Sequence, residues 1–248
     1  MLATLQIIYS FASRVNGCHL MILFINDIPV EILIADQMPD AGHYNHVLDA
    51  ATESITPAKL INHVWIKNVS EQDFDTLLGF LNSNVPTNIL SVILSIKGLV
   101  SAKKYLRTKF KIVQAAGGLI RKKEKFLMIY RLKKWDLPKG KKEKNEKYRH
   151  TAVREVEEEC NITVKLGPKI CTTWHTYTMN KNAMLKKTKW YLMDSVDDTK
   201  MKPALEEDIE ELRWMSRKEV FHGLKNSYKS IGYVFDQYYK KVKLKSAE

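Results

Sequence analysis

GKKEKNEKYRHTAVREVEEECNI, residues 140–162, is the most informative segment of the sequence. A helix turns by about 100° per residue, so Glu155, Glu158 and Glu159 would share one sector of a helix here. A different sector carries apolar residues that can dock on the protein: Ala152, Val153, Val156 and Cys160. The stretch therefore predicts an amphipathic helix whose acidic face repels itself unless a cation lies between the carboxylates.

Three oxygen donors crowded in this way suit a hard divalent cation, Mg²⁺ or Mn²⁺. Such an ion takes carboxylates and keeps waters and substrate phosphates in its shell. The alternative is a solvated acidic helix face, and for the segment EVEEE alone that outcome is the more common one. The spacing of the whole stretch favours the metal site.

The stretch resembles the signature of the Nudix hydrolases, G-x5-E-x7-R-E-U-x-E-E-x-G-U, where U is aliphatic. It matches that signature in register at Gly140, Glu146, Arg154, Glu155, Val156, Glu158, Glu159 and Ile162. Asn161 replaces the last glycine. Because asparagine also enters the left-handed region readily, we expect the turn that ends the helix to be kept. The resemblance implies a Nudix domain over residues 109–242, folded as an α/β/α sandwich around a mixed sheet.

The resemblance extends to the flanking segments. Residues 113–120 and 126–131 resemble the family's first core strands, and residues 135–140 follow with the pattern W-x-x-P-K-G. This pattern is similar to that of Nudix members acting on diadenosine polyphosphates. Later segments resemble two more strands, at 169–179 and 189–193, and a late acidic loop with its strand at 204–214.

The resemblance also implies roles for individual residues. Glu155, Glu158 and Glu159 are expected to hold Mg²⁺ or Mn²⁺, with the carbonyl of Lys139 as a further ligand. Arg154 is expected to orient a box glutamate through a charge-assisted bond, with Glu146 as its partner. The general base stays open among Glu158, Glu207, Asp208 and Glu210. The candidate substrate-binding residues are Arg131, Lys139, Gly118 and Tyr177, and for Tyr177 core packing competes with stacking on a base.

The expected function is Mg²⁺- or Mn²⁺-dependent hydrolysis of a pyrophosphate linkage in a nucleoside di- or polyphosphate derivative, such as a dinucleoside polyphosphate. Two alternatives stay open: removal of pyrophosphate from RNA 5′ ends, and a non-catalytic Nudix module that binds a nucleotide. The intact set of carboxylates argues against the second. The expected partner is a small-molecule nucleotide rather than RNA, and a homodimer is left open.

The positive charge of the chain is concentrated in one segment. The formal net charge is +12, and residues 97–149 alone carry nineteen Lys and Arg against four Asp and Glu. Next to an acidic metal site, such a segment suits a polyphosphate, whose charge Lys and Arg steer and hold. Nucleic acid is the alternative partner of this basic segment, but no recognisable nucleic-acid-binding motif accompanies the charge.

Residues 21–100 predict a small α/β domain of unknown role in front of the Nudix domain. Apolar runs at 21–25 and 30–35 flank Asn26-Asp27 and predict a hairpin. Further strands are expected at 64–66 and 89–96, and a helix is expected to begin at Ser70. Residues 1–20 are interpreted as an extension, with Met21 as an alternative start, because the positively charged region of a signal peptide is missing.

The remaining features concern location and the C-terminal part. No run of 18 or more apolar residues occurs, so no membrane span is expected. Cys18, Cys160 and Cys171 fit no metal-ligand spacing and suit a reducing cytosol, so a cytoplasmic location is expected.

Residues 216–219 have a capping-box pattern, and a last helix is expected at 227–242 before a basic tail at 243–248.

Overall fold

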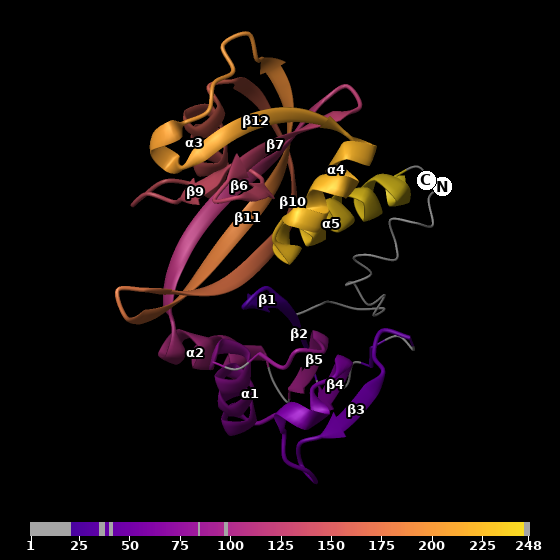
Figure 1. Cartoon of the computed structure of the whole chain (residues 1–248). Coiled ribbons are helices and arrows are strands. Elements are labelled where there is room, and N and C mark those ends of the chain that lie inside the picture. The colour runs from indigo at the N-terminus through magenta and orange to yellow at the C-terminus, as the bar shows by residue number, and fades with distance from the viewer. Residues whose placement is uncertain (1–20, 35–37, 40–41, 84, 97–98, 246–248) are drawn as a thin grey trace. The chain divides into compact units, whose positions relative to one another are not determined.

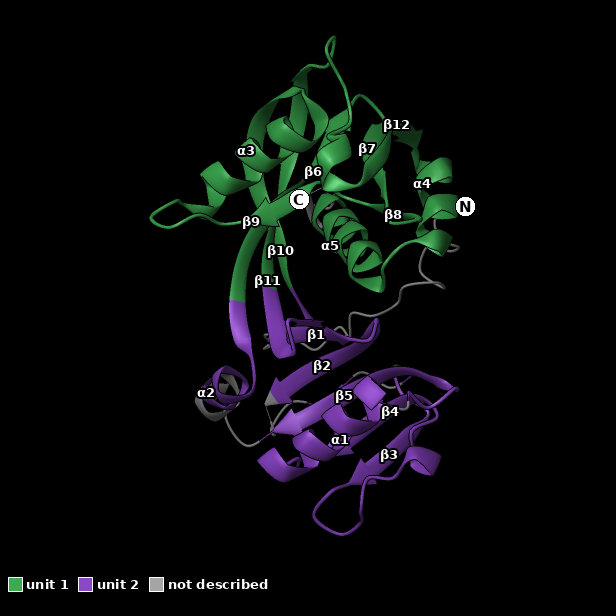
Figure 2. Cartoon of the chain, turned by 60° about the vertical axis from the view of Figure 1, so that its left-hand side comes forward, with its two compact units in different colours: residues 1–9, 113–173, 187–248 green, residues 10–112, 174–186 purple. Residues whose placement is uncertain are grey.

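We describe the chain from a computed structural model, in which residues 21–34, 38–39, 42–83, 85–96 and 99–245 are described. The chain divides into two compact units (Figure 2). The N-terminal unit takes the described residues up to Ile112 together with Trp174–Lys186, and the C-terminal unit takes Val113–Thr173 and the residues from Lys187 onward. The predicted extension at 1–20 lies outside the described residues.

The N-terminal unit is a mixed sheet with two helices. Its strands are β1 (Met21–Ile25), β2 (Ile28–Ile34), β3 (His46–Asp49), β4 (Asn62–Lys67) and β5 (Ile89–Ile96), and its helices are α1 (Glu71–Ser83), α2 (Leu99–Lys109) and a 3₁₀ turn at Pro57–Lys59. The strand order is β1-β2-β5-β4-β3. β1 and β2 pair antiparallel, whereas β2, β5, β4 and β3 pair in parallel. The α/β character expected for this region is confirmed.

The local sequence explains most of these elements. Asn26 and Asp27 both have positive φ, at 50° and 62°, which is the backbone of a tight two-residue hairpin between β1 and β2. Ser70 begins α1, because its hydroxyl accepts a hydrogen bond from the Asp73 N–H at 3.2 Å. The expected apolar stripe of α1 is buried in the core of this unit: Phe74, Leu77, Leu78 and Leu81.

The C-terminal unit contains the stretch that begins at Gly140. Its strands are β6 (Lys111–Lys122), β7 (Lys125–Arg131), β8 (Lys134–Asp136), β9 (Lys139–Lys141), β10 (Thr163–Met179), β11 (Asn182–Asp197) and β12 (Ile209–Ser216). Its helices are α3 (Tyr148–Cys160), α4 (Arg217–Gly223) and α5 (Lys229–Lys245), with 3₁₀ turns at Leu205–Glu207 and Leu224–Asn226. The sheet runs β12-β7-β6-β11-β10, while β8 pairs with β7 and β9 pairs with β6.

Helices pack on both faces of this sheet (Figure 1). Leu127 and Ile129 of β7 share a buried cluster with residues of α3. Phe126, the neighbour of Leu127, meets the aromatic rings of α5, with its centroid 5.4 Å from that of Phe235. Because successive side chains of a strand point to opposite faces, α3 and α5 lie on opposite sides of the sheet. The predicted α/β/α sandwich is therefore confirmed.

The C-terminal helices follow their sequence signals. Ser216 caps α4 through a capping box: its hydroxyl accepts from the Glu219 N–H, and the Glu219 carboxylate accepts from the Ser216 N–H at 2.7 Å. α5 continues to Lys245, so residues 243–245 of the predicted tail are helical. Residues 246–248 lie outside the described part of the chain.

Candidate active site

α3 is fixed to the sheet by its apolar face. Ala152, Val156 and Cys160 are fully buried against β6, β7 and β11, as the sequence pattern predicts. The helix ends at Asn161, which has φ 52° and ψ 48° and donates its backbone N–H to Glu157 O at 2.8 Å. The Asn161 side chain also donates to Lys200 O at 2.6 Å. Asparagine therefore keeps the left-handed turn expected of glycine at this position.

Three glycines allow close packing around the site: Gly118 and Gly140 approach α3, and Gly117 approaches the segment before β9. A Cβ atom on Gly140 would lie 1.7 Å from Glu155 Oε2, and one on Gly117 would lie 2.4 Å from Pro138 O. A Cβ atom on Gly118, a residue predicted to bind substrate, would lie 2.9 Å from Val156 Cγ2, so this glycine gives α3 room to pack on β6. Gly140, in contrast, leaves space for the carboxylate of Glu155.

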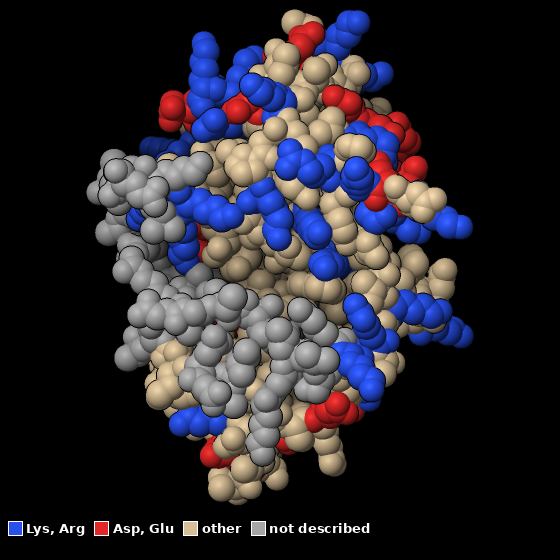
Figure 3. Space-filling view, turned by 180° about the vertical axis from the view of Figure 1, so that it is seen from behind, with Lys and Arg blue, Asp and Glu red and all other residues tan. Residues whose placement is uncertain are grey.

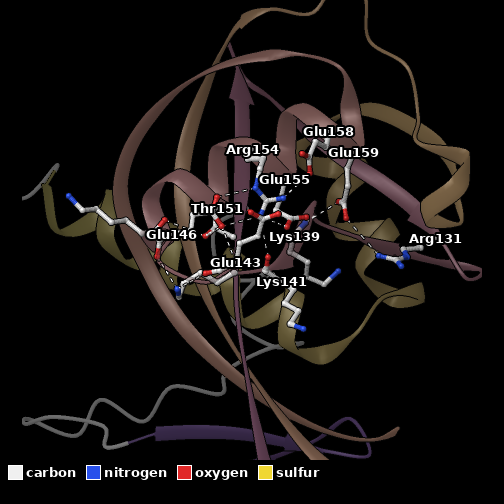
Figure 4. Close-up of polar contacts among 12 residues, drawn as sticks. Arg131, Lys139, Lys141, Glu143, Glu146, Thr151, Arg154, Glu155, Glu158 and Glu159 are labelled. Carbon is white, nitrogen blue, oxygen red and sulfur yellow. Dashed lines mark hydrogen bonds and ion pairs between the residues drawn. The ribbon is translucent and has the colours of Figure 1, made fainter. Parts of the chain in front are cut away.

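Arg154 is the centre of the polar network on α3 (Figure 4). Its Nε and Nη2 bind the two carboxylate oxygens of Glu146 at 3.0 and 3.1 Å, which confirms the contact expected between these two residues. Nη2 also donates to Lys141 O at 3.1 Å and lies 2.9 Å from Glu155 Oε1. Nη1 donates to Glu158 Oε2 at 2.8 Å. One guanidinium group therefore contacts three carboxylates and one carbonyl. The pKa of Arg154 is raised, mainly by its hydrogen bonds with Glu146.

Glu146 ties the loop before α3 to the helix. Besides Arg154, its carboxylate accepts from Thr151 Oγ1 at 2.8 Å and from the Glu143 N–H at 3.1 Å. Its hydrogen bonds with Arg154 are the main reason why the pKa of Glu146 falls to about 2. Thr151 and Glu143 were not singled out from the sequence, because neither residue type signals this contact on its own.

Glu159 lies in a different environment from its neighbours on α3. Its side chain is 3% exposed, whereas that of Glu158 is 61% exposed. Its Oε2 accepts the Lys139 N–H at 3.1 Å, and its Oε1 lies 3.8 Å from Arg131 Nη1. Burial raises the pKa of Glu159 to about 7, although Lys139 and Arg131 oppose this shift.

The two cations predicted to bind substrate flank Glu159. The ammonium group of Lys139 pairs with the carboxylate of Asp136, a buried residue that the sequence reasoning missed. Arg131 Nη2 lies 3.4 Å from Glu207 Oε2, and Arg131 Nε has no hydrogen-bond partner among the described residues. Of the late-loop acids, Glu207 is thus placed beside Arg131 and Glu159. Asp208 and Glu210 are exposed.

A shallow cavity of about 580 Å³ runs along α3. It is lined by residues of the helix, among them Arg154 and Glu158, and by Leu166 of β10. Tyr177 belongs to the N-terminal unit, so its role in substrate binding stays a prediction.

The carboxylates suit a divalent cation by chemical type, but they are not gathered around one point. Among the described residues, no group of three or more His, Cys, Asp or Glu side chains forms a metal site. The physical reason is that Arg154 binds Glu155 and Glu158, while Glu159 turns toward Lys139 and Arg131. Carboxylate oxygens are the donors that a hard cation takes, and Gly140 leaves room for the carboxylate of Glu155.

A pH-dependent loss of stability follows from the Glu146 contacts. Because its folded pKa is lowered from 4.5 to about 2, its stabilising effect is complete above pH 4.5 and disappears as the pH falls toward 2. We expect Glu146→Gln to lower the free energy of unfolding by about 1–3 kcal/mol at pH 7. The difference from the original chain should shrink at pH 3.5.

Urea unfolding at both pH values, with a chelator present, measures this difference. Glu157→Gln is the matched control, because Glu157 is an exposed glutamate on the same helix. A destabilisation by Glu146→Gln that is equally large at pH 7 and pH 3.5 would show that the charge of Glu146 is not what stabilises the loop.

None of the helices in the described residues is both long and apolar enough to cross a membrane.

The family model described as NUDIX domain matches residues 111–237. The chain is similar to the solved structure of a NUDIX hydrolase from Nitrosomonas europaea, with 19% identity and a TM-score of 0.43, over 53% of this chain and 73% of that one. It is also similar to a C. elegans Ap4A hydrolase in a binary complex, with 21% identity and a TM-score of 0.41, over 52% and 97% of the two chains.

A third similar structure is the MutT protein from Methanosarcina mazei Go1, with 25% identity and a TM-score of 0.41, over 53% of this chain and 98% of that one. A search of curated proteins gave no match. The match of the family model covers half of the chain, from β6 into the first half of α5, and includes the whole 140–162 stretch. The chain therefore belongs to the Nudix family of hydrolases.

Proposed function

We propose that this protein is a Mg²⁺- or Mn²⁺-dependent hydrolase that cleaves a pyrophosphate linkage in a nucleoside di- or polyphosphate derivative, with dinucleoside polyphosphates as the preferred class. The main support is the arrangement on α3, where Glu155 and Glu158 meet one guanidinium group and Glu159 lies buried beside two cations. In this arrangement, acids of the type that binds metal lie next to cations of the type that binds phosphate.

Glu155, Glu158 and Glu159, with the carbonyl of Lys139, would hold the metal. A bound divalent cation would neutralise phosphate charge, polarise phosphorus and lower the pKa of an attacking water. The protein supplies the positioning. Gly140 leaves room for the carboxylate of Glu155, and Arg154 fixes the loop to the helix through Glu146.

The proton of the attacking water requires a base. Glu158 is the candidate on α3, because its carboxylate is the most exposed of the three and lines the cavity along the helix. Glu207 is the candidate from the late loop, because it meets Arg131, which also lies beside Glu159. Both groups accept a proton in their ionised form.

Arg131 and Lys139 would bind the outer phosphates. Each now pairs with an acid, Glu207 or Asp136. A phosphate group suits the guanidinium group of Arg131, because guanidinium groups bind phosphates through several N–H donors. The cavity along α3 offers room for another part of the substrate next to Glu158.

A substrate panel tests the proposal. The full chain is incubated with Mg²⁺ or Mn²⁺ and dinucleoside polyphosphates, nucleoside triphosphates or a 5′-triphosphate RNA, and the products are separated by chromatography. We expect the highest kcat/KM with a dinucleoside polyphosphate. No turnover across the panel would contradict the proposal and favour a nucleotide-binding module.

Lys and Arg side chains gather on one face of the C-terminal unit (Figure 3), which favours RNA as the second candidate substrate. A preference for RNA that falls steeply with rising salt would identify it, because binding to many phosphates releases many counterions. The homodimer and the cytoplasmic location expected from the sequence stay predictions.

A further inference from the structure

Arg154 has contacts of two kinds, and the difference matters for metal binding if the proposed function is correct. Its Nε and Nη2 bind the carboxylate of Glu146, and Nη2 also donates to the carbonyl of Lys141. In addition, Nη2 meets Glu155 and Nη1 meets Glu158, which are two of the proposed metal ligands. A cation of the protein itself thus occupies carboxylates that a bound metal would need.

The contacts with Glu146 and Lys141 hold the guanidinium group firmly. Glu146 binds two nitrogens of Arg154 at once, and its side chain is only 14% exposed. It is fixed in turn by Thr151 and by the backbone of Glu143. Two parallel hydrogen bonds to a carboxylate are among the strongest contacts that arginine makes in proteins, so the contact with Glu146 should persist.

The contacts with Glu155 and Glu158 are easier to exchange. Nη2 carries two hydrogens but lies within 3.1 Å of three acceptors, on Glu146, Lys141 and Glu155, so it cannot bind all three fully at once. Glu158 is held through Nη1 and is 61% exposed, so water weakens that pair. Both carboxylates can therefore leave Arg154 without disturbing its contact with Glu146.

We propose that Arg154 is the internal counter-cation of the metal-free site, and that it competes with the divalent cation for the carboxylates of Glu155 and Glu158. Without metal, Arg154 relieves the repulsion between the acids of α3. When the metal binds, the carboxylates of Glu155 and Glu158 leave Arg154, which stays docked on Glu146 and on the carbonyl of Lys141. The guanidinium group therefore makes metal binding weaker and reversible, in addition to positioning the loop.

The test measures the dissociation constant of Mn²⁺ alone by titration of the full chain, with free Mn²⁺ followed by electron paramagnetic resonance. We expect Arg154→Gln to bind Mn²⁺ at least about 5-fold more tightly, the lower end of typical coupling between two sites. Arg121→Gln is the matched control and should bind as the original chain does, because Arg121 pairs with Asp194 at 2.8 Å and contacts none of the α3 acids. Equal or weaker binding by Arg154→Gln would overturn the inference, since Arg154 would then only position the ligands.

A second measurement needs no variant. Nitrogen-15 spectra of the arginine side chains are recorded on the original chain with and without Mg²⁺. We expect the Nη signals of Arg154 to shift on Mg²⁺ addition while its Nε signal, which reports the bond to Glu146, stays in place. Unchanged Nη signals in a chain that binds Mg²⁺ would overturn the inference alone, whereas an original chain that binds neither ion would contradict the proposed function as well.

Discussion

Glu159→Gln is expected to lower turnover by roughly 10²- to 10⁴-fold in saturating Mg²⁺ while the chain still folds, because several kcal/mol of charge stabilisation would be lost. Glutamine keeps the size of the side chain and an oxygen that can accept the Lys139 N–H. What it loses is the negative charge of the most buried acid of the proposed metal site. Glu158→Gln should have an effect of the same kind.

Steady-state kinetics together with circular dichroism check this prediction. Glu124→Gln is the matched control, because Glu124 is an exposed glutamate in the turn between β6 and β7 and does not line the cavity along α3. Wild-type rates in both Glu158→Gln and Glu159→Gln would show that the proposed chemistry is wrong.

Gly140→Ala is expected to lower turnover by about 10²-fold, the typical cost of moving a catalytic group by about 1 Å. The new Cβ atom would lie 1.7 Å from Glu155 Oε2, so the carboxylate must move away from its place beside Gly140 and Arg154. The end of a glutamate side chain can shift, whereas the backbone of β9 is fixed by its pairing with β6. The chain should therefore fold, with a loss of about 1–3 kcal/mol in the free energy of unfolding.

Gly223→Ala is the control for this change, because its Cβ atom would meet its neighbours at 3.4 Å, an ordinary contact distance. Thermal unfolding and Mn²⁺ titration of both variants separate damage to the fold from damage to the site. If Gly140→Ala kept normal turnover and normal Mn²⁺ affinity, the position of the Glu155 carboxylate against Gly140 would not be required for catalysis.

The sequence correctly predicted turns and helix starts where the residues that form them lie close together in the chain. The hairpin at Asn26-Asp27, the start of α1 at Ser70 and the capping box at Ser216 all depend on residues within four positions of one another. β3 and α2 were not predicted. β3 is only four residues long with a largely exposed pattern, and α2 lies in the basic segment, with four Lys or Arg among its eleven residues.

The 140–162 stretch indicated the helix, its apolar face, the left-handed turn at Asn161 and the contact between Arg154 and Glu146. It did not indicate that Trp174–Lys186 would belong with the N-terminal unit, because β10 and β11 are far longer than the strands expected at 169–179 and 189–193. Strand length depends on pairing partners elsewhere in the chain, which periodicity does not reveal.

The 140–162 stretch was sufficient to indicate the family through its resemblance to the Nudix signature, and that resemblance implied the sandwich fold and the chemical type of the proposed site. The differences among the acids of α3 become visible only in the folded chain. Glu158 faces solvent, Glu159 is buried beside Lys139 and Arg131, and Glu155 lies against Gly140. The reason is that burial and pairing are set by β6, β7 and β9, which reach these side chains from more distant parts of the chain.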